Sequence, residues 1–188
     1  NITKVDIYTN GKKETKVIDI TDRNMSFYFP SSTAPNLINF DADKVLLCKK
    51  TEDLSIEENI FKFNNSSLYK DKSEVLDVLR YKQKDSYLAH SIFLKALKDK
   101  NKFIRMEAAN MIEADKTNEK EVLLALQNII NTDTESNVRE KAINRIARIQ
   151  KAKCVDLLEQ VINKDSSYAV IAAALTNLKT YNYTAAYS

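Results

Sequence analysis

The residues with the greatest potential for chemistry are few in this chain of 188 residues. There is one histidine, His90, and there are two cysteines, Cys48 and Cys154. A zinc site normally draws on several imidazole or closely spaced thiolate ligands, and a cysteine nucleophile needs a neighbouring base. No carboxylate or thiol lies three or four residues from His90, so we interpret it as an exposed helical residue and both cysteines as buried free thiols. We predict no catalytic, cofactor-binding or metal-binding residue in this chain.

Composition excludes further classes of function. Gly11 is the only glycine, whereas phosphate-binding loops, dinucleotide fingerprints and nucleophile elbows all need glycines at fixed positions. The net charge is only +3, with both signs interspersed, so we predict no nucleic-acid partner. No apolar run is long enough to span a bilayer, and no targeting segment is visible. We therefore predict a soluble protein without a membrane span, in a compartment that the sequence does not specify.

Two arginines belong to an internal repeat. Residues 102–112 and 137–146 align as apolar-Arg-x-x-Ala-x-x-x-Ile, with Arg105 and Arg139 at equivalent positions, and residues 169–174 form a weaker copy. Repeats of this length, with two helices in each, are typical of α-solenoids, in which stacked neighbours bury a shared core. We expect the small alanines of the pattern to let adjacent helices approach closely.

The arginines allow two interpretations. A row of guanidinium groups on the inner surface of a solenoid could contact peptide carboxylates, so Arg105 and Arg139 are candidate peptide contacts. The alternative, which we favour, is a salt bridge between repeats, for example to Asp99 or Asp133 at the preceding turn.

The part of the chain before the repeats shows patterns that are typical of β-strands. Alternating apolar residues around Val5 and the Asn10-Gly11 pair predict a β-hairpin. Further strands are predicted at 25–29, 37–40 and 45–49, which together indicate a small antiparallel β-sandwich. Ser55 to Glu58 then has the form of a capping box, although the residues after it fit either a short helix or a strand.

These patterns predict an α+β chain with three regions: a β-sandwich over 1–51, connecting helices over 52–84, and an α-α superhelix of HEAT-like or ARM-like repeats over 85–188. The last residues, 181–188, carry no charged side chain. A solenoid needs a polar terminal repeat to stay soluble, so we expect the repeats of the parent protein to continue beyond this chain.

Two segments resemble the M1 family of zinc aminopeptidases. The run from Pro35 to Leu46 is similar to the strand, "apolar-x-Phe-Asp" turn and strand that end the small sandwich of that family. The run from Tyr69 to Leu76 is similar to its "Tyr-x-Asp-Arg-x-x-Ala-Leu" helix start, with Lys72 in place of Arg and Val75 in place of Ala. Together with the helical repeats, this resemblance extends over essentially the whole chain.

The resemblance implies an accessory role. The family's His-Glu-x-x-His zinc helix, its third zinc ligand and its exopeptidase loop belong to a preceding domain, and this chain contains none of them. It would help to enclose the active site of a zinc aminopeptidase that acts on peptide substrates, with the zinc held by the parent's catalytic domain. The alternative is a HEAT-type protein-interaction scaffold without peptidase activity. Substrate preference and oligomeric state are not predicted.

Overall fold

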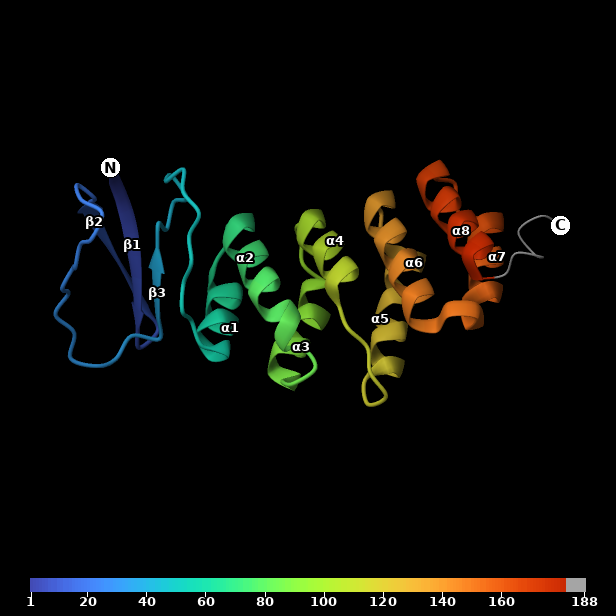
Figure 1. The fold of residues 1–188 in the computed structure, drawn as a ribbon, viewed down its shortest axis with the longest axis horizontal. Coiled ribbons are helices and arrows are strands. Elements are labelled where there is room, and N and C mark those ends of the chain that lie inside the picture. The colour runs from blue at the N-terminus through green and yellow to red at the C-terminus, as the bar shows by residue number, and fades with distance from the viewer. Residues whose placement is uncertain (182–188) are drawn as a thin grey trace. The chain divides into compact units, whose positions relative to one another are not determined.

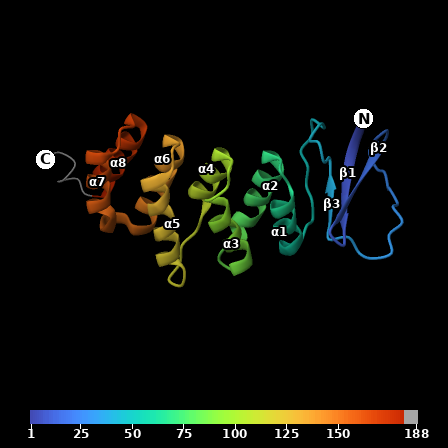
Figure 2. The same cartoon turned by 180° about the vertical axis from the view of Figure 1, so that it is seen from behind.

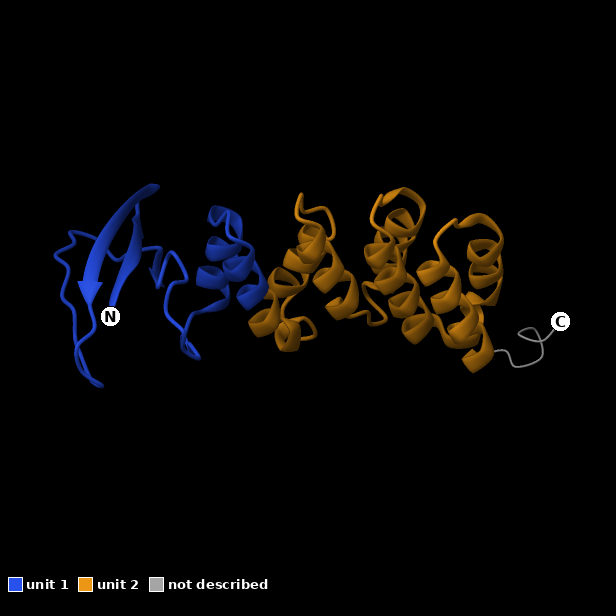
Figure 3. Ribbon diagram, turned by 90° about the horizontal axis from the view of Figure 1, so that it is seen from above, with its two compact units in different colours: residues 1–75 blue, residues 76–188 orange. Residues whose placement is uncertain are grey.

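The computed structural model describes residues 1–181, and the chain divides into two compact units, residues 1–75 and 76–188 (Figure 3). Each unit has its own core and is described by itself below. The expectation that the repeats continue rests on the uncharged tail, of which residues 182–188 lie outside the described part of the chain.

The first unit begins with an antiparallel sheet in the order β2-β1-β3 (Figure 1). Its strands are β1 (Ile2–Thr9), β2 (Lys12–Asp19) and β3 (Leu37–Phe40). Asn10 and Gly11 connect β1 to β2 with φ angles of 51° and 73°, so both central residues take the positive φ that a type I′ turn requires. The predicted hairpin is confirmed. Val5, Ile7 and Ile18 form a buried cluster on one face of this sheet.

Two of the predicted strands are wrong. Residues 25–29 form no strand. Phe29 packs from a loop onto the cluster of Val5, Ile7 and Ile18, whereas Met25 and Phe27 are 40 % and 38 % exposed. Residues 45–49 form none either. The backbone N–H groups of Val45 and Leu46 donate to the Asp41 carboxylate at 3.0 and 3.2 Å, and not to a neighbouring strand. The described residues thus contain a single three-stranded sheet.

Two helices complete the first unit, α1 (Ile56–Asn65) and the first part of α2 (Tyr69–Leu79). The capping box at the start of α1 is confirmed. Ser55 Oγ accepts from the Glu58 N–H at 3.1 Å, and the Glu58 carboxylate accepts from the Ser55 N–H at 2.8 Å. The residues after the box are therefore helical, which resolves the alternative between helix and strand.

The second unit consists mainly of three helix pairs that follow one another along the unit (Figures 1 and 2). They are α3 (Tyr87–Ala96) with α4 (Lys102–Met111), α5 (Glu119–Thr132) with α6 (Ser136–Gln150), and α7 (Val155–Lys164) with α8 (Tyr168–Tyr181), and short 3-10 turns precede α3 (Arg80–Lys82) and α7 (Lys151–Cys154). Helix α6 packs against both α4 and α8. The repeat alanines Ala108, Ala142 and Ala174 are fully buried at these contacts, as expected of small residues between close helices.

Candidate interaction surface of the helical repeats

The repeat arginines connect consecutive helix pairs. Arg105 lies on α4 and donates from Nε and Nη2 to the two carboxylate oxygens of Asp133, at 2.6 and 2.9 Å. Its Nη1 donates to the backbone carbonyl of Asp99 at 2.9 Å. Arg139 on α6 repeats this geometry, with 2.8 Å to each Asp165 oxygen and 2.9 Å to the Asp133 carbonyl. Each arginine therefore links the turn within its own helix pair to the turn within the next helix pair.

The Arg105–Asp133 and Arg139–Asp165 ion pairs are largely shielded from solvent. Burial alone would raise the pKa of Asp133, but hydrogen bonds from Arg105 and from the Glu135 N–H hold that pKa below its ordinary value. The hydrogen bond from Arg139 likewise lowers the pKa of Asp165. The favoured salt bridge between repeats exists, but its partner was predicted wrongly: the carboxylate comes from the following turn, and the preceding turn supplies only a backbone carbonyl. Contact of Arg105 and Arg139 with a bound peptide stays a prediction.

Two grooves separate the first helices of consecutive pairs. Between α5 and α7 lies a cavity of about 510 Å³, with an apolar floor of Ile130, Leu157 and Val161 and a rim that includes Gln160 and Lys164. Between α3 and α5 lies a second cavity of about 410 Å³, which combines apolar and charged side chains (Leu94, Leu97, Leu124, Ile129, Lys98 and Glu121). Cavities of this size accept a few side chains of a partner, since ligand sites commonly measure roughly 300–1,000 Å³.

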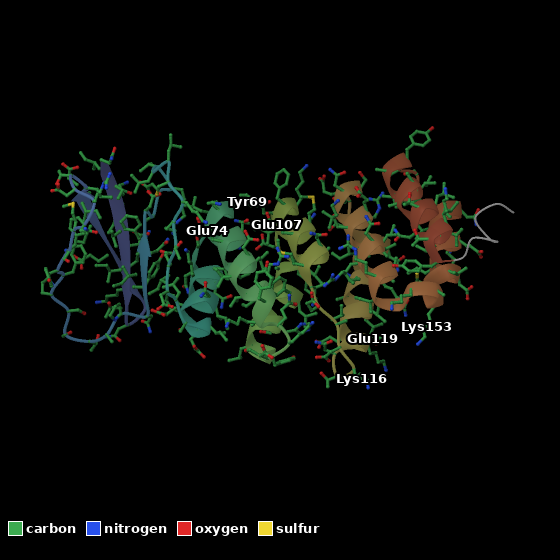
Figure 4. The ribbon with its side chains drawn as sticks, viewed as in Figure 1. Tyr69, Glu74, Glu107, Lys116, Glu119 and Lys153 are labelled. Atoms are coloured by element: carbon green, nitrogen blue, oxygen red, sulfur yellow. The ribbon has the colours of Figure 1, made fainter. Side chains whose placement is uncertain are left out.

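Leu124 is the most exposed apolar residue of these grooves. Its side chain is 57 % exposed, and it also borders a shallower hollow at the start of α5 beside Lys116 and Glu119, which Figure 4 labels. Leu124 was not among the residues predicted from the sequence. A leucine outside the buried stripe of an amphipathic helix was the available signal, because the stripe itself accounts for Leu126, Ile129 and Ile130.

A buried ionic cluster occupies the first unit. Lys62 on α1 is 2 % exposed and contacts Glu52 and Glu74 at 2.7 and 3.2 Å; Figure 4 labels Glu74 on α2. Lys44 contacts Asp71 at 2.6 Å. Burial would raise the pKa of Asp71, but the hydrogen bond from Lys44 contributes to a net lowering. Lys44 and Asp71 come from the two segments that carried the family resemblance, so these segments meet in a structural contact within one unit.

The prediction for His90 is wrong. The ring is 1 % exposed, and neither ring nitrogen has a hydrogen-bond partner. The buried face of α3 includes Ala89, Ile92 and Phe93 as well as His90, whereas the neighbouring Leu88 is 53 % exposed. Burial lowers the pKa of His90, whereas the charges of Glu121 and Asp115 oppose that shift.

The two cysteines differ in burial. Cys154 is buried as predicted, and burial raises its thiol pKa. Cys48 is exposed because it lies in the segment that forms no strand, so that half of the prediction is wrong. Within residues 1–181, no group of three His, Cys, Asp or Glu side chains is placed to hold a metal ion. Over the same range, none of the helices combines the length and the apolar character needed to cross a membrane.

Comparison with known proteins supports helical repeats in the second unit. Residues 90–179, from α3 into α8, match the family model described as HEAT repeats. No curated protein and no solved structure matches the chain. This match supports a helical repeat region in the second unit, and nothing in these comparisons points to a zinc aminopeptidase.

Proposed function

We propose that the chain is a protein-interaction scaffold, which binds a segment of another protein across the grooves between α3, α5 and α7. One observation supports this most directly: consecutive repeats leave two grooves, and the exposed Leu124 lies in the groove between α3 and α5. Binding sites of this kind combine apolar anchors in pockets with a polar rim. The HEAT-repeat match agrees, since solenoids present extended binding surfaces.

The grooves favour a partner with apolar side chains at intervals. Each groove has an apolar floor, and its charged side chains are of both signs, with Lys98 beside Glu121 in one groove and Lys164 beside Asp165 in the other. Such a site carries no strong preference for an acidic or a basic partner. We expect leucine-like side chains of a partner to enter the grooves while its polar groups contact the rims.

The accessory role beside a peptidase stays a prediction from the resemblance alone. No comparison favours it, and the contact between the two resembling segments is a buried structural contact that serves a scaffold equally well. The interaction scaffold is therefore the function that we put forward.

The test compares two leucine variants of the full chain as bait. Leu124→Glu places a charge in the groove between α3 and α5 without touching the core, whereas Leu47→Glu changes a fully exposed leucine of the first unit and serves as the control. We expect proteins that the wild type and Leu47→Glu retain to be lost with Leu124→Glu, as measured by quantitative mass spectrometry.

Hydrogen exchange of the chain with a recovered partner then locates the contact. Protection of the helices that line the grooves supports the proposal. Identical capture by both variants, or protection confined to the first unit, would contradict it. Far-UV circular dichroism of each variant verifies that the helices are intact before capture is compared.

A further inference from the structure

A buried histidine lies in line with one wall of the groove between α3 and α5. The His90 ring is 1 % exposed, and neither of its nitrogens has a hydrogen-bond partner. Leu94 and Leu97, four and seven residues after His90 on α3, line that groove. Residues at this spacing share one face of a helix. The His90 ring therefore continues the α3 wall beyond the end of the groove.

The facing wall on α5 begins with a carboxylate. Glu121 lines the groove together with Leu124, three residues later on the same helix. The Glu121 side chain is exposed and makes no hydrogen bond or ion pair within residues 1–181. Its negative charge acts on the His90 ring more strongly than that of Asp115. A protonated imidazole has two N–H donors, and Glu121 is a carboxylate that is free to accept from one of them.

The other groups around the ring are largely engaged elsewhere. Asp115, whose charge also acts on His90, accepts three hydrogen bonds within its own turn. Tyr87 on α3 has its ring centroid 6.2 Å from that of His90. Helix α4 and the 3-10 turn before α3 pack on α3, and their charged side chains are Lys102, Arg105, Glu107, Arg80 and Lys82. The two cations on α4 are paired with carboxylates of the next helix pair, and Glu107 has a partner of its own.

We propose that His90 is a pH sensor for the groove between α3 and α5: when its ring binds a proton, the Glu121 carboxylate turns from the groove rim toward the ring, and the groove loses affinity for its partner. This inference rests on the proposed function, because it concerns the regulation of the same groove. A buried imidazolium without a counter-charge is costly, which favours the inward movement of Glu121. The groove rim then lacks the carboxylate that, beside neutral His90, is free to accept hydrogen bonds from a partner.

The direction and the limit of the effect follow from linkage between proton binding and partner binding. Burial lowers the pKa of His90 from its ordinary value of 6.5, although the charges of Glu121 and Asp115 oppose this shift. A partner that prefers the neutral form therefore loses affinity as the pH falls through this lowered pKa. The loss at pH 5.5 is at most about tenfold, because a group with a pKa of 6.5 is about nine-tenths protonated there.

NMR titration of the full chain tests the coupling without any partner. The chain contains one histidine, so the imidazole signals report on His90 alone. Between pH 7.5 and 5.5 we expect the methyl signals of Leu94 and Leu124 to shift with the same midpoint as the His90 ring. The methyl signals of Leu157, which lines the other groove, should stay unchanged.

Two variants and a matched control assign these shifts. His90→Leu and Glu121→Gln should each abolish the pH-dependent shifts of Leu94 and Leu124. Glu119→Gln removes a different carboxylate from α5, one that lines the neighbouring hollow and not this groove (Figure 4), and it should keep them. A ring that stays neutral down to pH 5.5 would overturn the inference, and so would leucine signals that do not follow the ring or that shift equally in His90→Leu.

A binding measurement then tests the effect on a recovered partner. From pH 7.5 to 5.5 we expect the dissociation constant of the wild type to rise by up to about tenfold, and that of His90→Leu to rise by clearly less. Equal changes for the two proteins would contradict the regulation. The NMR titration stands even if no partner depends on Leu124, so the two proposals fail separately. Far-UV circular dichroism at each pH verifies that the helices are intact.

Discussion

At the scale of single residues, His90 is a titratable group whose surroundings disfavour its charged form. Its ring is buried without a hydrogen-bond partner, so the folded chain favours the neutral imidazole. Burial lowers its pKa from the ordinary value of 6.5. The unfolded chain, in contrast, exposes the ring and binds a proton near that ordinary value.

This difference predicts a loss of stability on mild acidification. The folded pKa is lowered, so below pH 6.5 the unfolded state binds more protons than the folded state, and the free energy of unfolding falls as the pH falls. One proton gives a slope of at most about 1.4 kcal/mol per pH unit. His90→Leu should flatten this dependence between pH 7 and 5, as measured by urea denaturation. Equal slopes for the variant and the wild type would contradict the assignment.

The sequence could not predict the environment of His90. Its helical position was readable from the periodicity of α3, but its burial depends on helices from elsewhere in the chain that cover this side of α3. The exposure of Cys48 has the same origin, because it depends on a strand that does not form. For single residues, local pattern predicts the element and tertiary contact decides the surroundings.

At the scale of elements, the arginine pairs set how one helix pair stacks on the next. Arg139 and Asp165 are 14 % and 11 % exposed and joined by two hydrogen bonds. The exposed pair of Lys102 and Glu135 also connects two helix pairs, at 50 % and 39 % exposure. Solvent screens the second pair far more than the first. The two pairs thus differ in burial and not in the kind of elements that they join.

Replacing Arg139 or Lys102 by methionine tests this difference between the buried and the exposed ion pair. Arg139→Met leaves the Asp165 carboxylate sheltered without its partner, and we expect the free energy of unfolding to fall by about 2 kcal/mol. Lys102→Met should change it by less than about 0.5 kcal/mol. Adding Asp165→Asn to Arg139→Met should restore part of the loss, because the side-chain oxygen still accepts from the Ser167 N–H and no uncompensated charge then remains. Chemical denaturation measures all three, and equal losses for Arg139→Met and Lys102→Met would refute the argument.

Elements that depend on interactions between residues close in sequence could be predicted from the sequence. The Asn10-Gly11 turn and the Ser55 capping box act between neighbouring residues, and both appear as expected. The strands predicted at 25–29 and 45–49 required a distant partner that the described sheet does not supply. Of the candidate surface, the repeat arginines were identified from spacing, but the grooves were not, because a groove is a space between helices that no single helix specifies.

At the scale of the whole molecule, the division into two units predicts independent folding of the repeats. The second unit buries its own core of repeat residues, such as Ile104, Ala142 and Leu158. Its start also contributes a specific contact. Gln83 is 4 % exposed, donates to the Met111 carbonyl at 3.0 Å and accepts from the Glu113 N–H at 2.9 Å, which caps the end of α4.

Two fragments test this independence. A fragment of residues 76–188 corresponds to the second unit and retains Gln83, and we expect a helical circular dichroism spectrum with a cooperative thermal transition. A fragment of residues 85–188 lacks Gln83, which leaves the Glu113 N–H without its acceptor and the Met111 carbonyl with only the 3.4 Å hydrogen bond from Arg145, so its free energy of unfolding should be lower by about 2 kcal/mol. A longer fragment without a cooperative transition would show that the repeats need the first unit, and equal stabilities would remove the role of Gln83.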